Sequence, residues 1–171
     1  IKLIASDLDG TLLQNGAQEL TPRAIDLIHR LTKKGICFVA ASGRQYSNEL
    51  ILFRDIKDEI SYIAENGSLC VHQGKIISRG IIEEDLAYRI IDEVKRNGNF
   101  EILVSREDTC LIEDHDPAFV NHIVNVIRNK TEIVKDIRQI SGPFLKIAIC
   151  NMAGDKRILE DALKRLQDLF R

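Results

Sequence analysis

The chain has 171 residues, of which 44% are hydrophobic and 29% are charged, as is ordinary for a soluble chain with one large domain or two small ones. The 24 basic residues nearly balance the 26 acidic ones, so the formal net charge is only -2. This balance argues against nucleic acid or an anionic membrane as the partner, and a small molecule fits better.

The N-terminus has no pattern of an export signal, because Asp7 and Asp9 interrupt the early apolar run. No apolar stretch approaches the roughly 18 residues of a membrane span. The cysteines lack C-x-x-C pairing and most lie in apolar runs, which favours reduced core thiols in a cytoplasmic protein over a metal or disulfide role. The four are Cys37, Cys70, Cys110 and Cys150.

The chain opens with a strand pattern followed by a helix pattern. Residues 1–6 are apolar with one lysine, which predicts a strand buried on both faces of a parallel sheet, with Asp7 at its carboxyl end. Thr21 and Pro22 fit the N-cap and first residue of a helix, whose apolar stripe stops at Gly35. Strand and helix therefore already alternate in this part of the chain.

The alternation continues through the first half of the chain. Residues 36–41 predict a second buried strand, Ser42-Gly43-Arg44 follows it, and a helix runs to about residue 53. Residues 62–64 predict a third strand. This order favours an α/β fold with a Rossmann-like, doubly wound parallel sheet. A hairpin of residues 69–71 and 75–78, turned at Gln73-Gly74, completes this half.

The strict alternation of strands and helices ends at about residue 82, and a separate α+β unit is expected beyond it. We therefore predict two domains, residues 1–81 and residues 82–171. The elements expected in the second are a helix over residues 83–97 ended by Gly98, strands over 100–105 and 109–113, a helix capped by Asp116, a weak strand near Ile133, a strand over 144–150 and a helix over 155–170.

Two carboxylates, Asp7 and Asp9, follow the first predicted strand. Ligands bind at the carboxyl ends of parallel strands, and carboxylates so close together need a counterion. A hard cation such as Mg²⁺ is the natural one, since it takes oxygen ligands together with substrate phosphate. Gly10 lets the backbone turn sharply, although aspartate and glycine also form ordinary turns.

The second predicted strand ends in Ser42, Gly43 and Arg44. The Ser42 hydroxyl and the amides at a helix start supply donors for an anion. A plain N-cap role for Ser42 is the alternative, and the two are compatible. Two neighbouring strand ends are therefore expected to build one phosphate site.

These residues resemble a known family. Asp7-Leu8-Asp9-Gly10-Thr11 is similar to the first signature of the haloacid dehalogenase superfamily, and residues 39–44 look like the second. The resemblance implies that Asp7 is phosphorylated, that Asp9 protonates the leaving group and later activates water, and that Mg²⁺ is held by the Asp7 carboxylate and the Asp9 main-chain carbonyl. It also implies phosphate or substrate contacts from Leu8, Ser42, Gly43 and Arg44.

Residues 63–68, with Asn66 at the centre, resemble the Cof-like subgroup, whose members carry an α+β cap domain after the second signature. The first domain is then the N-terminal part of the core, and the second is the cap. Asn66 is expected to approach substrate or to serve as a turn residue.

The family also requires a later lysine and an acidic metal motif. Lys146 and Gly154-Asp155 are the candidates, but only nine positions separate Lys146 from Asp155, too few for the helix and strand that normally intervene. We therefore expect Lys146 to be a strand residue and Asp155 a helix cap, and the chain to stop inside the cap. The 171 residues alone are expected to be a weak catalyst.

Glu113-Asp114-His115-Asp116 suggests a metal cluster at first sight, but consecutive residues converge poorly, so capping is favoured. The isolated histidines are better explained by surface or packing roles than as general bases.

The resemblance implies a Mg²⁺-dependent phosphatase for small phosphorylated metabolites, such as sugar phosphates, that acts through an aspartyl-phosphate. The cap would choose the substrate. The alternatives are a phosphomutase, in which the phosphoryl group on Asp7 returns to substrate, and a non-catalytic phosphate-binding module. A receiver-type switch fits poorly, because Asp7 and Asp9 both follow the first strand.

Overall fold

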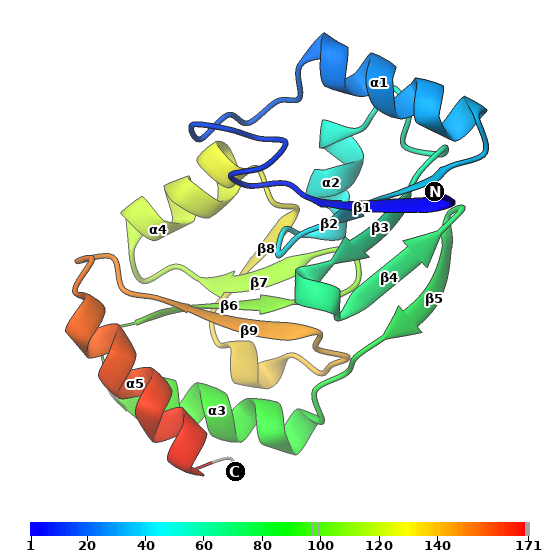
Figure 1. Ribbon diagram of the computed structural model, residues 1–171. Helices are drawn as coiled ribbons and strands as arrows, with labels where there is room; N and C mark the ends of the chain where they lie inside the picture. The colour runs from blue at the N-terminus through cyan, green and yellow to red at the C-terminus, as the bar shows by residue number, and fades with distance from the viewer. Residues whose placement is uncertain (97, 99, 170–171) are drawn as a thin grey trace. The chain divides into compact units, whose positions relative to one another are not determined.

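The computed structural model describes residues 1–96, 98 and 100–169, and the chain divides into two compact units, Ile1–Gly80 and Ile81–Arg171. Each unit is built on one β-sheet that carries helices, as the ribbon shows (Figure 1). The predicted α/β class is confirmed by this mixture of strands and helices. The expected helix ends at Asn97 and Phe170 lie outside the described residues.

The first unit contains a five-stranded sheet in the order β1-β2-β3-β4-β5. Strands β1, β2 and β3 pair in parallel, whereas β4 and β5 form the predicted antiparallel hairpin. The strands are β1 (Leu3–Asp7), β2 (Cys37–Ala41), β3 (Ser61–Ala64), β4 (Leu69–His72) and β5 (Lys75–Arg79). Parallel order brings the carboxyl ends of β1, β2 and β3 to the same edge of the sheet.

Two helices connect the parallel strands, α1 (Pro22–Lys33) and α2 (Tyr46–Leu52), and both lie on the same side of the sheet (Figure 1). The predicted start of α1 is confirmed, because the Thr21 side chain accepts a hydrogen bond of 3.2 Å from the amide of Ala24. Gly35 follows the helix with φ +76, a conformation that glycine adopts without strain.

Strand β1 differs from its prediction in burial. Its residues alternate between exposed and half-buried, and the Leu3 side chain is 56% exposed, so the expectation of burial on both faces was wrong. The reason is its place at the edge of the sheet, where, among the described strands, it pairs with β2 alone. The neighbouring β2 does show the predicted burial, at Phe38, Val39 and Ala40.

The second unit contains a four-stranded sheet in the order β8-β7-β6-β9. Its strands are β6 (Glu101–Ser105), β7 (Cys110–Glu113), β8 (Thr131–Val134) and β9 (Lys146–Cys150), and its helices are α3 (Glu84–Arg96), α4 (Pro117–Asn121) and α5 (Lys156–Leu169). These match the predicted elements. The sequence reading did not anticipate the π-helical turn His122–Ile127 or the short 3₁₀ helices Glu65–Gly67 and Ile137–Gln139.

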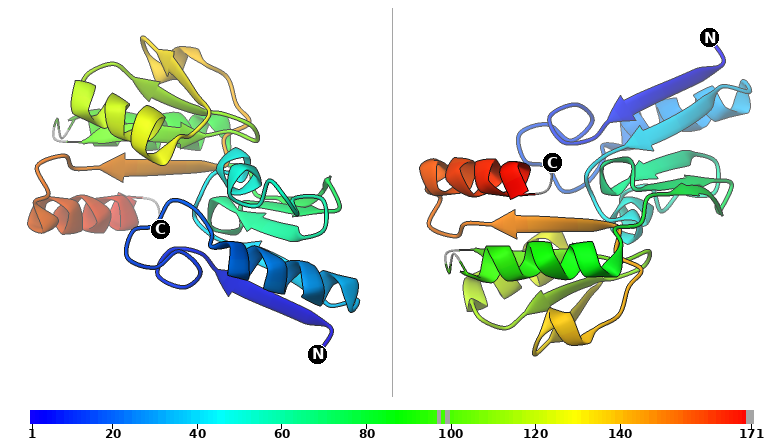
Figure 2. Two further views of the ribbon diagram at one scale, coloured as in Figure 1. Left: turned by 90° about the horizontal axis from the view of Figure 1, so that it is seen from above. Right: turned by 90° about the horizontal axis from the view of Figure 1, so that it is seen from below.

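Helices cover both faces of this second sheet. Ile91 of α3 packs with Val104 and Leu111 on one face, where Leu166 of α5 joins the same apolar cluster. Phe119 of α4 packs on the opposite face. In Figure 1, α3 and α5 lie below β6 and β9, and α4 lies above them; in the right view of Figure 2, α5 and α3 flank β9.

All four cysteines are free thiols, but only Cys110 is fully buried, so the expected burial holds for one of them and the other three are half-buried. Within the described residues, the structure contains no helix of sufficient length and apolar character to cross a membrane.

Candidate active site

The signature residues lie where the three parallel strands end. In the register of the first sheet, Asp7 on β1 pairs with Ala41 on β2, and Ala41 pairs with Ile63 on β3. The amide of Ser42 donates a hydrogen bond of 2.9 Å to the Ile63 carbonyl, which extends the pairing by one residue. Asp7 and Ser42 therefore leave the ends of adjacent strands at the same edge.

The segment after Asp7 forms a tight turn. The amides of Thr11 and Leu13 donate to the carbonyl of Leu8 at 3.1 and 2.7 Å, and Gly10 has φ +86, which favours glycine. The Leu8 side chain is fully buried, so the turn is anchored in the core and Leu8 has only its main chain to offer a ligand. The Thr11 hydroxyl donates to Asp7 Oδ2 at 3.1 Å and orients this exposed carboxylate.

Asp9 forms a two-point ion pair with Arg44, although 35 residues separate them in sequence. Arg44 Nε donates to Asp9 Oδ2 at 2.8 Å, and Nη2 donates to Oδ1 at 2.7 Å. This hydrogen bond from Arg44 lowers the pKa of the Asp9 carboxyl, while partial burial opposes the shift. The same pairing raises the pKa of Arg44, whose side chain is only 11% exposed.

Ser42 holds a turn rather than capping a helix. Its hydroxyl accepts a hydrogen bond of 3.2 Å from the amide of Arg44, and the side chain is nearly buried. Helix α2 starts only at Tyr46, with Gln45 as its N-cap residue. The alternative in which Ser42 caps the helix was wrong, because the turn of residues 42–44 intervenes.

Asn66 lies against this turn. The main-chain amide of Asn66 donates to the Ser42 carbonyl at 3.1 Å, and the main-chain amide of Glu65 donates to the Arg44 carbonyl at 3.0 Å. A Cβ atom added to Gly43 would lie 2.5 Å from Asn66 Oδ1, so only glycine fits at that position without displacing the asparagine. Glu65 and Asn66 both have positive φ, so this turn is held in a conformation that few side chains favour.

A buried carboxyl group of α2 lies near Glu65 and Arg44, and the sequence pattern did not predict it. Glu49 of α2 is completely buried, and among the described residues neither of its carboxylate oxygens has a hydrogen-bond partner. Burial, together with the nearby Glu65 carboxylate, raises the pKa of Glu49 to about 9, and the charge of Arg44 offsets part of this shift. A glutamate three residues after a tyrosine in a short helix gave no signal of such burial.

The donors near Asp7 suit a hard divalent cation. Asp7 offers an exposed carboxylate and Asp9 a main-chain carbonyl, and Mg²⁺ commonly takes one or two such oxygens together with substrate phosphate and water. Within the described residues, no three histidine, cysteine or acidic side chains gather into a metal cluster. The chain therefore supplies part of an oxygen-rich site, with the carboxylate of Asp9 directed to Arg44.

The downstream candidates belong to the second unit. Lys146 is the first residue of β9, and Asp155 precedes α5 and accepts a hydrogen bond of 2.9 Å from the amide of Arg157. The expected strand and capping roles are confirmed. Asp116 likewise caps α4, where it accepts from the amides of Ala118 and Phe119 at 2.7 and 3.2 Å.

Two isolated histidines take part in local hydrogen bonds. His29 Nδ1 lies 2.8 Å from a carboxylate oxygen of Glu59, and His72 Nδ1 lies 2.7 Å from the Ser61 hydroxyl. None of these four residues belongs to the signature segments, which agrees with the packing and surface roles expected for the histidines.

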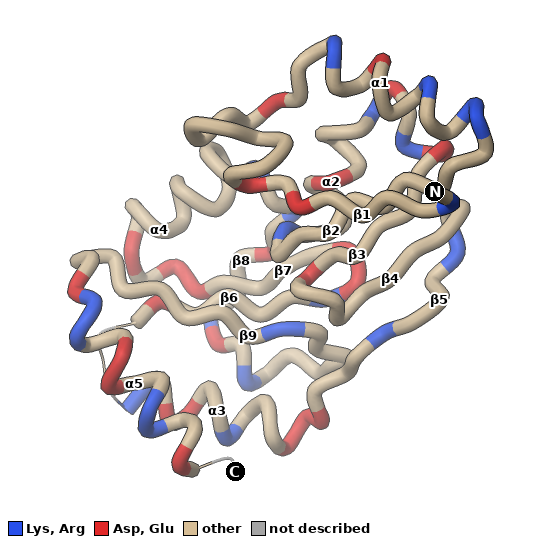
Figure 3. The backbone as a smooth tube through the Cα atoms, in the orientation of Figure 1, with Lys and Arg blue, Asp and Glu red and all other residues tan. Residues whose placement is uncertain are grey.

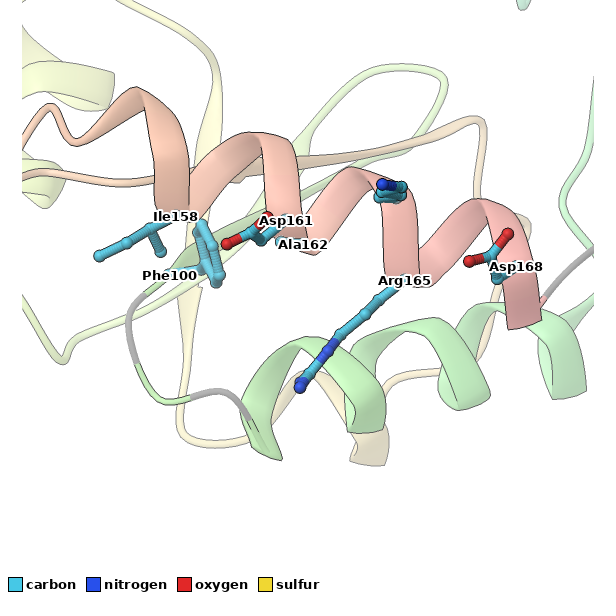
Figure 4. A pocket seen from close by; sticks show the side chains of 7 residues that line it. Phe100, Ile158, Asp161, Ala162, Arg165 and Asp168 are labelled. Carbon is cyan, nitrogen blue, oxygen red and sulfur yellow. The ribbon is translucent and has the colours of Figure 1, made fainter.

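A pocket of about 390 Å³ lies beside α5 in the second unit (Figure 4). Acidic and basic residues alternate along α3 and α5 in Figure 3, so neither helix carries a single sign of charge. None of the signature residues line the pocket. Its lining residues are Phe100, Ile158, Asp161, Ala162, Lys164, Arg165 and Asp168.

Comparison with known proteins places these features in a family context. The 5-amino-6-(5-phospho-D-ribitylamino)uracil phosphatase YbjI of Escherichia coli (strain K12) is 27% identical over 150 residues, which are 87% of this chain and 55% of that protein. A crystal structure from Eubacterium rectale matches with a TM-score of 0.79 and 29% identity over 92% of this chain and 60% of that one.

A haloacid dehalogenase-like hydrolase from B. subtilis has the same fold, with a TM-score of 0.81 at 18% identity, covering 98% of this chain and 67% of that one. The chain spans only about half the length of the curated relative named above. The family described as haloacid dehalogenase-like hydrolase matches residues 4–171, which is nearly the entire chain. The chain therefore belongs to the haloacid dehalogenase-like hydrolase family.

Proposed function

We propose that this chain forms part of a phosphatase that transfers the phosphoryl group of a small phosphate ester first to Asp7 and then to water. The observation that carries the proposal is the shared edge of the first sheet. Asp7 ends β1 and pairs with Ala41, so the Asp7 carboxylate and the Ser42 turn leave adjacent strand ends. An exposed nucleophile beside hydroxyl and amide donors is the arrangement that phosphoryl transfer requires.

In the first step, an oxygen of the Asp7 carboxylate attacks phosphorus, and the bond from phosphorus to the ester oxygen breaks. Asp9 gives a proton to that leaving oxygen, so the alcohol departs neutral; for this the Asp9 carboxyl must first take up a proton and release one of its two hydrogen bonds from Arg44. In the second step, water gives a proton to Asp9 and attacks phosphorus. The aspartyl-phosphate bond breaks, and inorganic phosphate leaves while the Asp7 carboxylate is restored.

Ser42 and Gly43 are proposed to hold the oxygens of the transferring phosphoryl group through the hydroxyl and the main-chain amide. Mg²⁺ would be held by the Asp7 carboxylate and the Asp9 main-chain carbonyl, and when bound it supplies charge screening for the phosphoryl oxygens. The hard oxygen donors at this strand end support that choice.

The two compact units suggest a division of labour. We propose that Ile1–Gly80 is the N-terminal part of the catalytic core and that Ile81–Arg171 serves as a cap that chooses the substrate. The E. coli relative is named for a phosphorylated ribitylamino-uracil, which supports a small phosphorylated metabolite as the substrate class. A cytoplasmic location fits such a substrate.

The test is phosphate release from an aryl phosphate, with and without Mg²⁺. It compares the 171-residue chain, its Asp7→Asn variant and a C-terminally extended form of the relatives' length. We expect turnover by the extended form only with Mg²⁺, loss of turnover in Asp7→Asn, and weak turnover by the chain alone. An extended form that is inert across varied phosphate esters would contradict the proposal and favour the non-catalytic phosphate-binding module.

Phosphomutase activity is distinguished by the products. A mutase returns the phosphoryl group from Asp7 to substrate, so a phosphorylated isomer accumulates and little inorganic phosphate is released. A hydrolase releases inorganic phosphate in the same amount as the alcohol. Chromatography of the organic products together with a phosphate assay separates the two reactions.

A further inference from the structure

The guanidinium of Arg44 donates hydrogen bonds to three side chains of this unit, those of Asp9, Gln18 and Asn48. An arginine side chain has five N–H donors in a rigid plane. Two of them point to Asp9, as described above, and Nη1 donates to Asn48 Oδ1 at 3.0 Å. The remaining Nη1 and Nη2 donors reach Gln18 Oε1, each at 3.3 Å.

Every N–H of Arg44 therefore has an acceptor from this chain. A substrate phosphate could bind this guanidinium only by displacing one of them. The family resemblance implies that Arg44 contacts phosphate or substrate. The geometry instead favours a role for Arg44 that is exerted through Asp9.

Gln18 and Asn48 come from different parts of the unit. Asn48 is nearly buried in α2, four residues after Arg44 in the chain, so its side chain has little freedom. Gln18 lies in the exposed loop between β1 and α1, and its Nε2 donates to the Gly16 carbonyl at 3.1 Å. That bond directs the Gln18 oxygen toward Arg44.

We propose that Gln18 and Asn48 are positioning residues for Asp9, because together they fix the orientation in which Arg44 donates its two hydrogen bonds to the Asp9 carboxylate. The proposal rests on the acid and base role given to Asp9 above. A guanidinium held only by Asp9 can pivot with it, whereas one that is also held by two amide oxygens keeps the carboxylate in one place. Fixed placement of a proton-transfer group matters for the rate of the chemical step.

The kinetic test uses Gln18→Leu, which removes the acceptor at an exposed position, with Gln14→Leu as the matched control in the same exposed loop. In the form of the protein that turns over, Gln18→Leu is expected to lower kcat about three- to ten-fold, as expected for loss of a hydrogen bond to a charged donor, with KM unchanged. Gln18→Glu, which keeps an oxygen acceptor, should recover most of that loss. A rise in KM at constant kcat, or an equal effect in Gln14→Leu, would overturn the proposal.

A second readout needs no turnover. In the 171-residue chain, NMR of the Arg44 Nε–Hε group reports how rigidly the guanidinium is held. We expect Gln18→Leu to speed exchange of this proton with water at least about three-fold, as expected when a hydrogen bond that restrains the group is lost, and Gln14→Leu to leave the rate unchanged. If exchange does not respond to Gln18→Leu, the positioning role fails even where the protein is an active phosphatase. If exchange responds in a protein that hydrolyses no phosphate ester, the proposed function fails while the coupling of Gln18 to Arg44 stands.

Asn48→Leu provides an independent variant from the other side of the guanidinium. Because Asn48 is nearly buried, its folding is checked first by circular dichroism. The exposed Gln18 variants keep the test decisive if Asn48→Leu does not fold.

Discussion

Arg44 and Asp9 meet through two parallel hydrogen bonds of 2.8 and 2.7 Å, and this ion pair joins the end of β1 to the turn after β2. Two-point pairs of this kind fix both distance and orientation. The pair therefore links the first signature of the chain to the second, although the two residues lie 35 positions apart in the sequence.

The first prediction concerns the ionisation of Asp9. Replacement of Arg44 by glutamine removes the main cause of the lowered Asp9 pKa, so the pKa should rise toward its ordinary value. Titration of the Asp9 carboxyl carbon by NMR measures the change. Arg30→Gln is the control, because Arg30 forms an exposed pair with Asp26, with 3.9 Å between the charged atoms. An Asp9 pKa that stays low in Arg44→Gln would contradict the assigned cause.

The second prediction concerns stability and pH at Glu49. Its pKa of about 9 in the folded protein lies above the ordinary value of 4.5, so the folded form keeps a proton that the unfolded chain releases between these values. The free energy of unfolding contributed by Glu49 should therefore fall as pH rises through this window. Glu49→Gln stays neutral and should remove that fall.

A difference of one in pKa corresponds to about 1.4 kcal/mol. The free energy of unfolding of Glu49→Gln should therefore rise relative to that of the parent chain by about 2 kcal/mol or more between about pH 5 and about pH 8. Urea unfolding at the two pH values measures this gain. Glu160→Gln, an exposed position on α5, serves as the control and should show no such trend. Parallel pH profiles for the parent chain and Glu49→Gln would rule the prediction out.

The third prediction concerns the close approach of Gly43 and Asn66. Gly43→Ala would place a methyl group 2.5 Å from Asn66 Oδ1, the end of an exposed side chain that must turn aside, and we expect a loss of up to about 1 kcal/mol in the free energy of unfolding. Adding Asn66→Gly removes the obstructing side chain and suits the positive φ of 58 at this position. The double variant should recover most of the loss in urea unfolding; additive losses would show that the two positions do not interact.

The fourth prediction concerns a buried ion pair in the second unit. Lys95 Nζ lies 2.7 Å from Glu113 Oε1 and 3.0 Å from Asp136 Oδ1, and Glu113 Oε1 also accepts from the amide of Ile137 at 2.7 Å. Lys95→Met leaves the Glu113 carboxylate, whose side chain is only 6% exposed, without this cation. We expect a loss of about 1–3 kcal/mol, since breaking one side of a buried pair is costly and Lys95 retains some contact with water.

Thermal or urea unfolding measures the effect of Lys95→Met. The matched control is Lys164→Met on α5, an exposed lysine for which the same substitution should change stability by less than about 0.5 kcal/mol. Equal losses in the two variants would indicate that the Lys95 contacts add nothing to stability.

Much of the local structure follows from short-range patterns. The start of α1 at Pro22 follows from the Thr21 cap, and the hairpin of β4 and β5 turns at Gln73 and Gly74 as predicted, where both residues have positive φ. Caps and tight turns depend on a few consecutive residues, so their chemistry is legible in the sequence. The same holds for the position of Asp7 at the end of a strand.

The contacts around Asp9 depend on segments that lie far apart in the chain. Gln18 gives no local sign that it accepts from Arg44, 26 residues away, and nothing in α2 marks Glu49 as a fully buried carboxyl. Burial and partner choice are decided by how elements pack, and a single periodic pattern does not specify its neighbours.

Strand β1 illustrates both what local sequence predicts and what only packing decides. Its apolar run was enough to predict an extended segment ending at Asp7, because strand propensity and the following turn are local properties. Its exposure was decided by the sheet, where β1 pairs with β2 and, among the described strands, with no other. The sequence by itself thus determined the order of the main helices and strands, the caps at Thr21, Asp116 and Asp155, and the signature residues. Only the tertiary structure decided which side chains are buried and that Arg44 grips Asp9, because these depend on distant segments meeting in space.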